Sequence, residues 1–196
     1  MLDERYVIHR LSLQDRDLMA RLAAYVEALD SRVREGTGWL IFSADRQRSA
    51  RVERMIREGL VAFRPFVSSY LAPWRDVALN AYVEIELRQQ APRVSAAADD
   101  PQRKEFDLAQ RVARDTRAWM RRCDLLLVWS VAPAQRHELD YLEEVLAARY
   151  ERRLASLVLT PRSAEQLAAD VRALDPTPGR WERLYQRLYE RSLIAL

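Results

Sequence analysis

The stretch Gly38-Trp-Leu-Ile-Phe-Ser-Ala-Asp-Arg-Gln-Arg-Ser-Ala-Arg51 decides the fold that the sequence predicts. It opens with an apolar run, which is typical of a strand buried on both faces. From Asp45 onward the pattern becomes helical, with Val52, Ile56 and Leu60 on one side. A buried strand that runs through a short turn into a helix is the unit from which parallel α/β sheets are built.

The turn in this stretch lies where nucleotide-binding proteins carry their phosphate-binding loop. That loop has the spacing G-x-x-x-x-G-K-[ST], in which bare glycine backbone and a lysine hold the phosphates. On this spacing the chain has Ser43 and Arg48 for the glycines, Ser49 for the lysine and Ala50 for the hydroxyl residue. Its only lysine, Lys104, is far along the chain. We therefore expect a nucleotide-binding skeleton that no longer handles nucleotide.

A second apolar strand supports the same expectation. It reads Asp124-Leu-Leu-Leu-Val-Trp-Ser-Val-Ala132, and it ends at Trp129 and Ser130. In a working ATPase the corresponding strand ends in acidic residues that hold the metal ion. We therefore predict no metal, no bound cofactor and no catalytic set at these two turns.

Three arginines at the start of the helix after the first strand, Arg46, Arg48 and Arg51, leave weak anion binding open. The helix dipole and the guanidinium charges both favour an anion there. Bulky side chains at the former glycine positions oppose the close backbone approach that a triphosphate needs. Hydrolysis is therefore not expected.

Composition indicates one globular domain spanning residues 1–196. The chain is 49% hydrophobic and 31% charged, and its net charge is only +3. No apolar run approaches the roughly 20 residues of a membrane span, and the amino-terminus lacks the pattern of a signal peptide. A lone cysteine, Cys123, excludes an internal disulfide and is consistent with a cytoplasmic protein. We expect it to be an inert buried side chain.

Strands alternate with helices along the rest of the chain, which predicts a parallel sheet of about five strands with helices on both faces. Residues 77–90 fit a strand or a helix, and residues 91–101 read as a mobile loop. In the helix expected over 105–122, Phe106, Leu108, Val112 and Trp119 are expected to face inward. The expected strands are 39–42, 66–70, 125–129, 154–159 and 193–196; the other expected helices are 11–34, 135–152, 163–174 and 181–190.

The final third of the chain resembles the DnaC/IstB family of AAA+ ATPases, which are helicase loaders and transposition helpers. The residues that carry the resemblance are Asp124-Leu-Leu-Leu-Val, Ala148-Arg-Tyr-Glu-Arg-Arg, Leu157-Val-Leu-Thr followed by Glu165-Gln-Leu, and Gly179-Arg-Trp-Glu-Arg-Leu. The resemblance spans most of the chain but is clear only from about residue 117 onward. It implies a P-loop NTPase-like AAA+ core. It does not include the amino-terminal region with which such loaders contact helicase and DNA.

Two functional motifs of the family can be located on this chain only through the resemblance. Pro161 and Arg162 stand where the family has its sensor asparagine. Arg183 falls where the family carries an arginine finger, with Arg187 one turn later. A finger acts on the nucleotide of a neighbouring subunit, so it could persist in a subunit that binds none. The competing interpretation of both arginines is a solvated helix face.

No other catalytic or metal-binding set emerges from the sequence. His9 and His137 show no ligand spacing with cysteine or aspartate. Glu84 and Glu86 would form a carboxylate pair only if their segment were the edge of a strand in a cleft.

The sequence thus predicts a pseudo-ATPase, and the resemblance implies that it serves as an accessory protein in DNA replication or transposition. Its expected partner is a replicative helicase or an active AAA+ protein. The alternative is an arginine-rich protein that binds single-stranded nucleic acid, because residues 180–191 interleave arginines with aromatic side chains.

Overall fold

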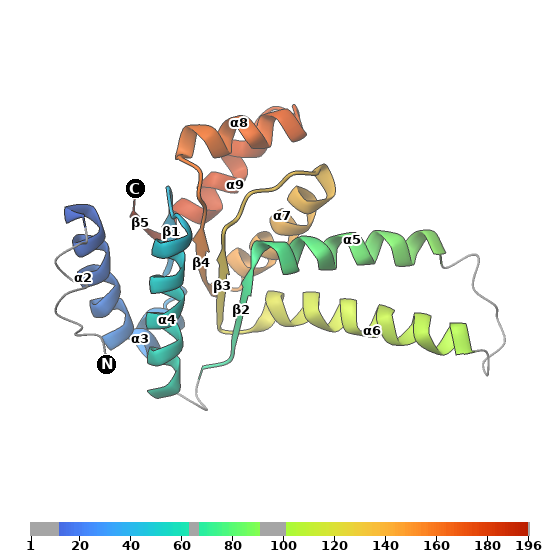
Figure 1. The fold of residues 1–196 in the computed structure, drawn as a ribbon, viewed down its shortest axis with the longest axis horizontal. Helices are drawn as coiled ribbons and strands as arrows, with labels where there is room; N and C mark the ends of the chain where they lie inside the picture. Colours follow the sequence, from blue (N-terminus) through green and yellow to red (C-terminus); the bar gives the residue numbers. More distant parts are fainter. Residues whose placement is uncertain (1–11, 63–66, 91–100, 196) are drawn as a thin grey trace.

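A sheet of five parallel strands forms the centre of the computed structural model, which describes residues 12–62, 67–90 and 101–195 (Figure 1). The order of the strands across the sheet is β2-β3-β4-β1-β5. The sequence predicted a parallel sheet of about five strands, and the structure confirms both the class of sheet and the number of strands. Their bounds are β1 Gly38–Ile41, β2 Ser69–Pro73, β3 Leu125–Trp129, β4 Ala155–Leu159 and β5 Ser192–Ala195.

The central strands are mostly apolar because helices cover both faces of the sheet. Side chains alternate between the faces along each strand. Leu40 and Leu126 therefore join one core, while Trp39, Ile41 and Leu127 join the other. The first core is covered by α5 (Trp74–Gln90), α6 (Pro101–Arg122), α7 (Arg136–Glu151), α8 (Ala164–Leu174) and α9 (Arg180–Tyr189), and the second by α2 (Leu13–Glu27), α3 (Leu29–Arg34) and α4 (Arg46–Ala62).

Helices α5 and α6 form a long hairpin between the neighbouring strands β2 and β3, and it extends well beyond the sheet (Figure 1). A small separate core of Leu87, Phe106 and Ala113 joins the two helices. The prediction that Leu108, Val112 and Trp119 face inward was wrong, since they are 59%, 56% and 44% exposed. The outer part of α6 packs on α5 alone, so only one narrow side of the helix is buried and apolar side chains on its other sides stay exposed.

Several boundaries differ from those the sequence predicted. The first helical segment is two helices, α2 and α3, separated at Ala28, and Ser12 caps α2 by accepting a hydrogen bond from the Asp15 amide (3.0 Å). Residues 77–90, ambiguous in sequence, belong to α5. Strand β2 begins at Ser69 rather than at 66 and ends at Pro73, which an edge strand tolerates. Of the predicted loop 91–101, only Pro101 lies within the described residues, and it is the first residue of α6, where proline is favoured.

Predictions for the chain's last third are confirmed. The helix expected over 163–174 is α8, and Ser163 caps it in a capping box with Gln166. The apolar end of the chain forms the closing strand β5, which pairs with β1. Cys123 is fully buried, as expected.

Arg149 on α7 is fully buried beside the first residues of β3 and β4, with no carboxylate among its hydrogen-bond partners. Its guanidinium instead donates to main-chain carbonyls, one hydroxyl and the Cys123 sulfur (3.4 Å), and we call this arrangement the Arg149 clamp. The oxygen acceptors are the carbonyls of Met120 (2.7 Å), Cys123 (2.8 Å), Asp124 (3.3 Å) and Ala155 (2.6 Å), and the Ser156 hydroxyl (2.9 Å). The clamp therefore ties α6, α7, β3 and β4 together at one edge of the sheet.

Arg180, at the start of α9, is buried among carboxylates. Its guanidinium pairs with Asp140 and Asp175, and its Nε donates to Glu143 at 3.0 Å. We call this group the Arg180 cluster. It joins α7, α9 and the segment between α8 and α9. No helix within the described residues is long and apolar enough to cross a membrane.

Candidate functional site

The turn between β1 and α4 is too short for a phosphate-binding loop with the spacing of the ATPase motif. Helix α4 begins at Arg46, so Arg48, Ser49 and Ala50 lie in its first turns rather than in a loop. In the ATPase motif the residues between the two glycines form the loop that wraps the phosphates. Here only Phe42 to Asp45 lie between the strand and the helix.

The amide groups of this turn already have acceptors within the protein. The Ser43 amide donates to the Arg162 carbonyl (2.9 Å), and the Ala44 amide donates to the Thr160 carbonyl (2.8 Å). The Asp45 amide donates back to the Ser43 carbonyl at 3.1 Å. Anion-binding turns work by directing such amides at the ligand. In this turn those three amides are directed into the protein.

A carboxylate of the chain itself caps the start of α4. Asp45 accepts a hydrogen bond from the Arg48 amide at 2.7 Å. A negative group there satisfies a helix-end amide and interacts favourably with the helix dipole. Asp45 thus takes the place that an external anion would have. Sequence reasoning missed this role, although an aspartate directly before a helical pattern is a common capping signal.

Two of the three arginines predicted to attract an anion pair instead with Asp15 on helix α2, and the Arg48 guanidinium also lies 3.4 Å from the carbonyls of Phe42 and Ser43 in the turn. The Nε of Arg48 donates to Asp15 at 2.8 Å, and Arg51 lies 3.6 Å from the same carboxylate. Partial burial opposes ionisation of Asp15, but the hydrogen bonds from Arg48 and Ser12 hold the pKa of this carboxyl below its usual value. The Arg48 side chain is only 12% exposed. It therefore serves the contact between α2 and α4 and also holds the turn after β1.

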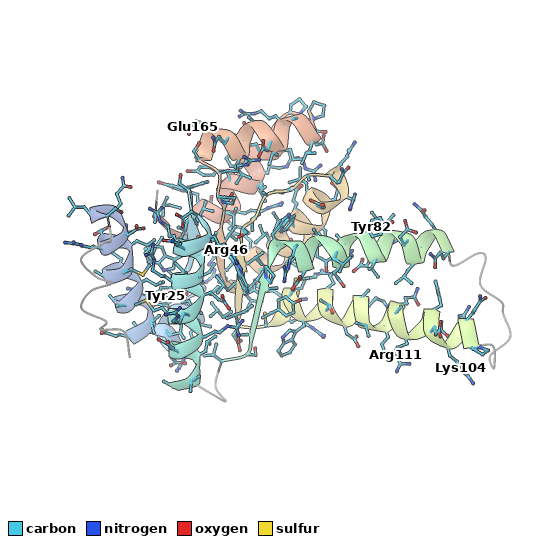
Figure 2. The ribbon with its side chains drawn as sticks, viewed as in Figure 1. Tyr25, Arg46, Tyr82, Lys104, Arg111 and Glu165 are labelled. Carbon is cyan, nitrogen blue, oxygen red and sulfur yellow. The ribbon has the colours of Figure 1, made fainter. Side chains whose placement is uncertain are left out.

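The third arginine, Arg46, which Figure 2 labels, borders a hollow of about 730 Å³ that lies at the carboxyl ends of β2 and β3. Open parallel sheets bind their ligands at this edge. The hollow brings the two predicted turns together, because Ser49 and Ala50 line it along with Trp129 and Ser130. Its other lining residues, which the sequence did not single out, are Glu53, Pro73, Trp74 and Arg75.

The hollow holds little of what a metal–triphosphate complex needs. Glu53 is the only carboxylate among its lining residues, and the described residues contain no group of three His, Cys, Asp or Glu side chains placed to hold a metal ion. The lysine predicted to be remote, Lys104, is near the outer end of the α5–α6 hairpin (Figure 2). Ser49 is buried, and its hydroxyl lies 3.3 Å from the Ala44 carbonyl.

The remaining candidates lie outside the hollow. Arg183 is exposed on α9, and its guanidinium lies 3.4 Å from the Pro178 carbonyl. Arg187 is 30% exposed and pairs with Glu143 at 3.4 Å. Glu84 and Glu86 do not form a pair, because two positions apart on helix α5 they face different sides, and only Glu84 is buried. His9 lies outside the described residues, and the ring of His137 lies 6.5 Å from that of Tyr82.

Comparison with known proteins gives a likeness of fold. No protein family matches the sequence, and no curated protein matches it. The solved structure described as the crystal structure of the DnaC helicase loader is similar to this chain with a TM-score of 0.59. The similarity covers 94% of this chain and 90% of that chain, at 10% sequence identity. The chain thus shares the fold of that loader, which confirms the predicted class of fold, a parallel sheet of five strands with helices on both faces.

Proposed function

We propose that this chain, built on the fold of a helicase loader, is a non-hydrolysing accessory protein of DNA replication or transposition. It acts in the cytoplasm and binds a replicative helicase or an active AAA+ protein as a scaffold or regulator. The observation that carries the proposal is the turn after β1. Its amides are occupied by Thr160, Arg162 and Ser43, and its helix end is capped by Asp45.

A phosphate group could enter this turn only by breaking those contacts. Each main-chain hydrogen bond lost without replacement would cost about 1 kcal/mol or more. The carboxylate of Asp45 would also repel the phosphate at short range. Both effects oppose nucleotide binding, and neither lysine nor a pair of carboxylates lines the neighbouring hollow to offset them.

Calorimetry with ATP and with ADP, each with Mg²⁺, tests the nucleotide half of the proposal. We expect no saturable heat, which corresponds to a dissociation constant weaker than about 1 mM. The Arg46→Ala variant removes the arginine that borders the hollow and should behave in the same way. Saturable Mg²⁺-dependent binding that Arg46→Ala abolishes would show a working site. So would Mg²⁺-dependent hydrolysis above background that Arg48→Ala abolishes.

An exposed apolar surface on the hairpin supports a protein partner. Leu79 on α5 and Leu108 and Val112 on α6 are 60%, 59% and 56% exposed, and all three line an open groove of about 510 Å³. We call them the apolar stripe. Apolar side chains gathered in this way on a surface commonly mark a contact with another protein. Arg183 offers a second point of contact, by analogy with a finger acting on the partner's nucleotide.

We expect the Leu108→Glu variant to lose its helicase or AAA+ partner in pull-downs from the cells in which the chain is made. A buried charge opposite an apolar partner costs several kcal/mol, so recovery of the partner should fall at least about ten-fold. Arg111→Glu is the matched control, because Arg111 lies on the same helix and points away from α5 (Figure 2). Equal loss in both variants, or no helicase or AAA+ protein recovered by the wild type, would contradict the proposal.

The second candidate function, binding of single-stranded nucleic acid, stays a prediction. On α9 the residues that suggested it are partly committed to the core, since Arg180, Trp181 and Leu184 are buried. Tyr185 stacks on Trp181 with ring centroids 5.2 Å apart. Binding of a labelled single strand that weakens steeply with salt would favour this function over the first.

A further inference from the structure

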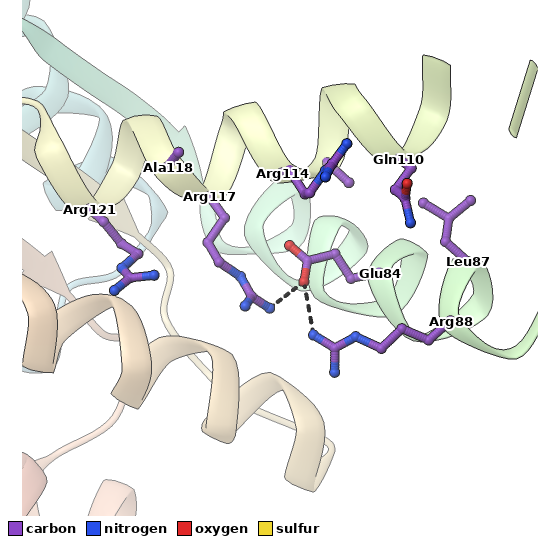
Figure 3. A pocket seen from close by; sticks show the side chains of 9 residues that line it. Glu84, Leu87, Arg88, Gln110, Arg114, Arg117, Ala118 and Arg121 are labelled. Atoms are coloured by element: carbon purple, nitrogen blue, oxygen red, sulfur yellow. Dashed lines mark hydrogen bonds and ion pairs between the residues drawn. The ribbon is translucent and has the colours of Figure 1, made fainter. Parts of the chain in front are cut away.

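A pocket of about 360 Å³ lies between α5 and α6, on a part of the hairpin that the proposed function does not use (Figure 3). Its lining contains four arginines and one carboxylate. Arg88 comes from α5, and Arg114, Arg117 and Arg121 come from α6, where their spacing places them along one side of the helix. Glu84 projects from α5 into their midst (Figure 3).

The Glu84 side chain is buried to nine-tenths but is only half satisfied. Its Oε2 accepts from Arg117 and lies 3.5 Å from Arg88. Its Oε1 is buried and has no hydrogen-bond partner. Burial raises the pKa of Glu84, while the charges of Arg117 and Arg88 act in the opposite direction. A buried acceptor left without a donor destabilises the protein, so a ligand that supplies the donor would recover that free energy.

The arginines around Glu84 also have unused donors. The Nε atoms of Arg117 and Arg121 are buried without partners. Glu144 is the second carboxylate near them, at 3.1 Å from Arg117 and 3.3 Å from Arg121. Arg114 forms no ion pair within the described residues. Four guanidinium groups thus face two carboxylates, and the excess positive charge calls for an anion.

We propose that this pocket binds a phosphate group that carries a proton, either as inorganic phosphate or as a phosphate monoester. Arg114, Arg117 and Arg121 donate to the phosphate oxygens, which suit guanidinium forks. The P–O–H group of the ligand donates to Glu84 Oε1. One ligand thereby satisfies unpaired atoms of both kinds.

The carboxylate makes the site selective among anions. An ionised carboxylate only accepts hydrogen bonds, so it repels an oxyanion that has no proton to offer. Sulfate at neutral pH has none, whereas inorganic phosphate keeps at least one. The pocket should therefore prefer phosphate to sulfate, although the two anions have the same shape. This inference is independent of the turn after β1, and it holds whether or not that turn binds nucleotide.

Titration calorimetry at constant ionic strength tests the proposal with three probes: inorganic phosphate and sulfate at pH 7.0, and adenosine monophosphate at pH 5.5, below the second pKa of about 6 at which a phosphate monoester loses its last proton. We expect phosphate to bind about ten-fold or more tightly than sulfate, as the loss of one charged hydrogen bond implies. Arg114→Gln should weaken phosphate binding about ten-fold. Arg111→Gln, the same change on the same helix outside the pocket, should leave it unaltered.

The Glu84→Gln variant separates selectivity from affinity. Its amide can donate to sulfate, so the preference for phosphate over sulfate should fall to near one. Adenosine monophosphate binding that is lost in Arg114→Gln would support the same site with an esterified phosphate as its source. Equal binding of phosphate and sulfate by the wild type, no binding of any probe, or binding that Arg114→Gln leaves unchanged would each overturn the proposal.

Discussion

Replacing Arg149 by Met is expected to lower the free energy of unfolding by about 3–5 kcal/mol, because several buried carbonyls lose their hydrogen-bond donor at once. Methionine fills much of the space, but it leaves the carbonyls of Met120, Cys123 and Ala155 without their donor. Each such buried carbonyl costs about 1–3 kcal/mol when it stays unpaired. The total free energy of unfolding of a domain is about 5–15 kcal/mol, so the variant should be close to unfolding at physiological temperature.

Urea unfolding followed by circular dichroism measures the effect. Arg149→Lys provides a second measurement if the Met variant does not fold. It should be destabilised nearly as much as Arg149→Met, because an ammonium group has three donors for the five oxygen acceptors of the clamp. Arg152→Met is the matched control, since Arg152 is exposed just after the same helix. A loss below about 1 kcal/mol in Arg149→Met would show that the clamp does not stabilise the fold.

The Arg180→Met variant is expected to lose about 3 kcal/mol at pH 7, because it removes the cation that Asp140, Glu143 and Asp175 share. The Arg180 side chain is 7% exposed, so water cannot readily replace it. Arg183→Met, on the same helix, serves as the control because Arg183 is exposed and pairs with no carboxylate among the described residues. Equal stability of the two variants would contradict the assigned role of the Arg180 cluster.

The pH dependence of the free energy of unfolding, compared between wild type and Arg180→Met, provides an independent check. Hydrogen bonds from Thr177, and then those from Arg180 and the charge of Arg136, hold the pKa of Asp175 well below its ordinary value of 3.8. A carboxyl with a depressed pKa stabilises the fold above its ordinary pKa, and this contribution is lost as the pH falls below that value. The difference between wild type and Arg180→Met should therefore be complete at pH 7 and narrow below about pH 4. A difference that widens in acid would exclude the proposed linkage.

The class of fold was predictable because its signals are local. Apolar runs such as Leu125–Trp129, with helical periodicity after each, fix parallel strands and crossover helices without any long-range information. The α5–α6 hairpin was harder to predict, because Val83, Ile85 and Leu87 alternate with Glu84 and Glu86 as they would in a strand. The prediction that Leu108 and Val112 face inward was wrong because apolar spacing shows that a helix has an apolar side, but it does not show that another element covers that side.

The site was predictable in composition but not in geometry. Ser43, Ser49, Ala50, Trp129 and Ser130 were identified from spacing, and four of them do line one hollow. The orientation of Arg48 toward Asp15 could not be predicted, since the two residues are far apart in sequence and meet only when α2 packs on α4. The same holds for Glu84 and Arg117, whose contact depends on how the hairpin closes.

The Arg149 clamp holds the amino-terminal edge of the sheet, whereas the turn after β1 and the hollow lie at the carboxyl-terminal edge. Substitutions at one edge therefore leave the main cross-links of the other intact. A lineage built in this way can exchange its ligand chemistry residue by residue while the scaffold persists. Substitutions accumulated in this way would leave two proteins with the same fold and almost no detectable sequence similarity.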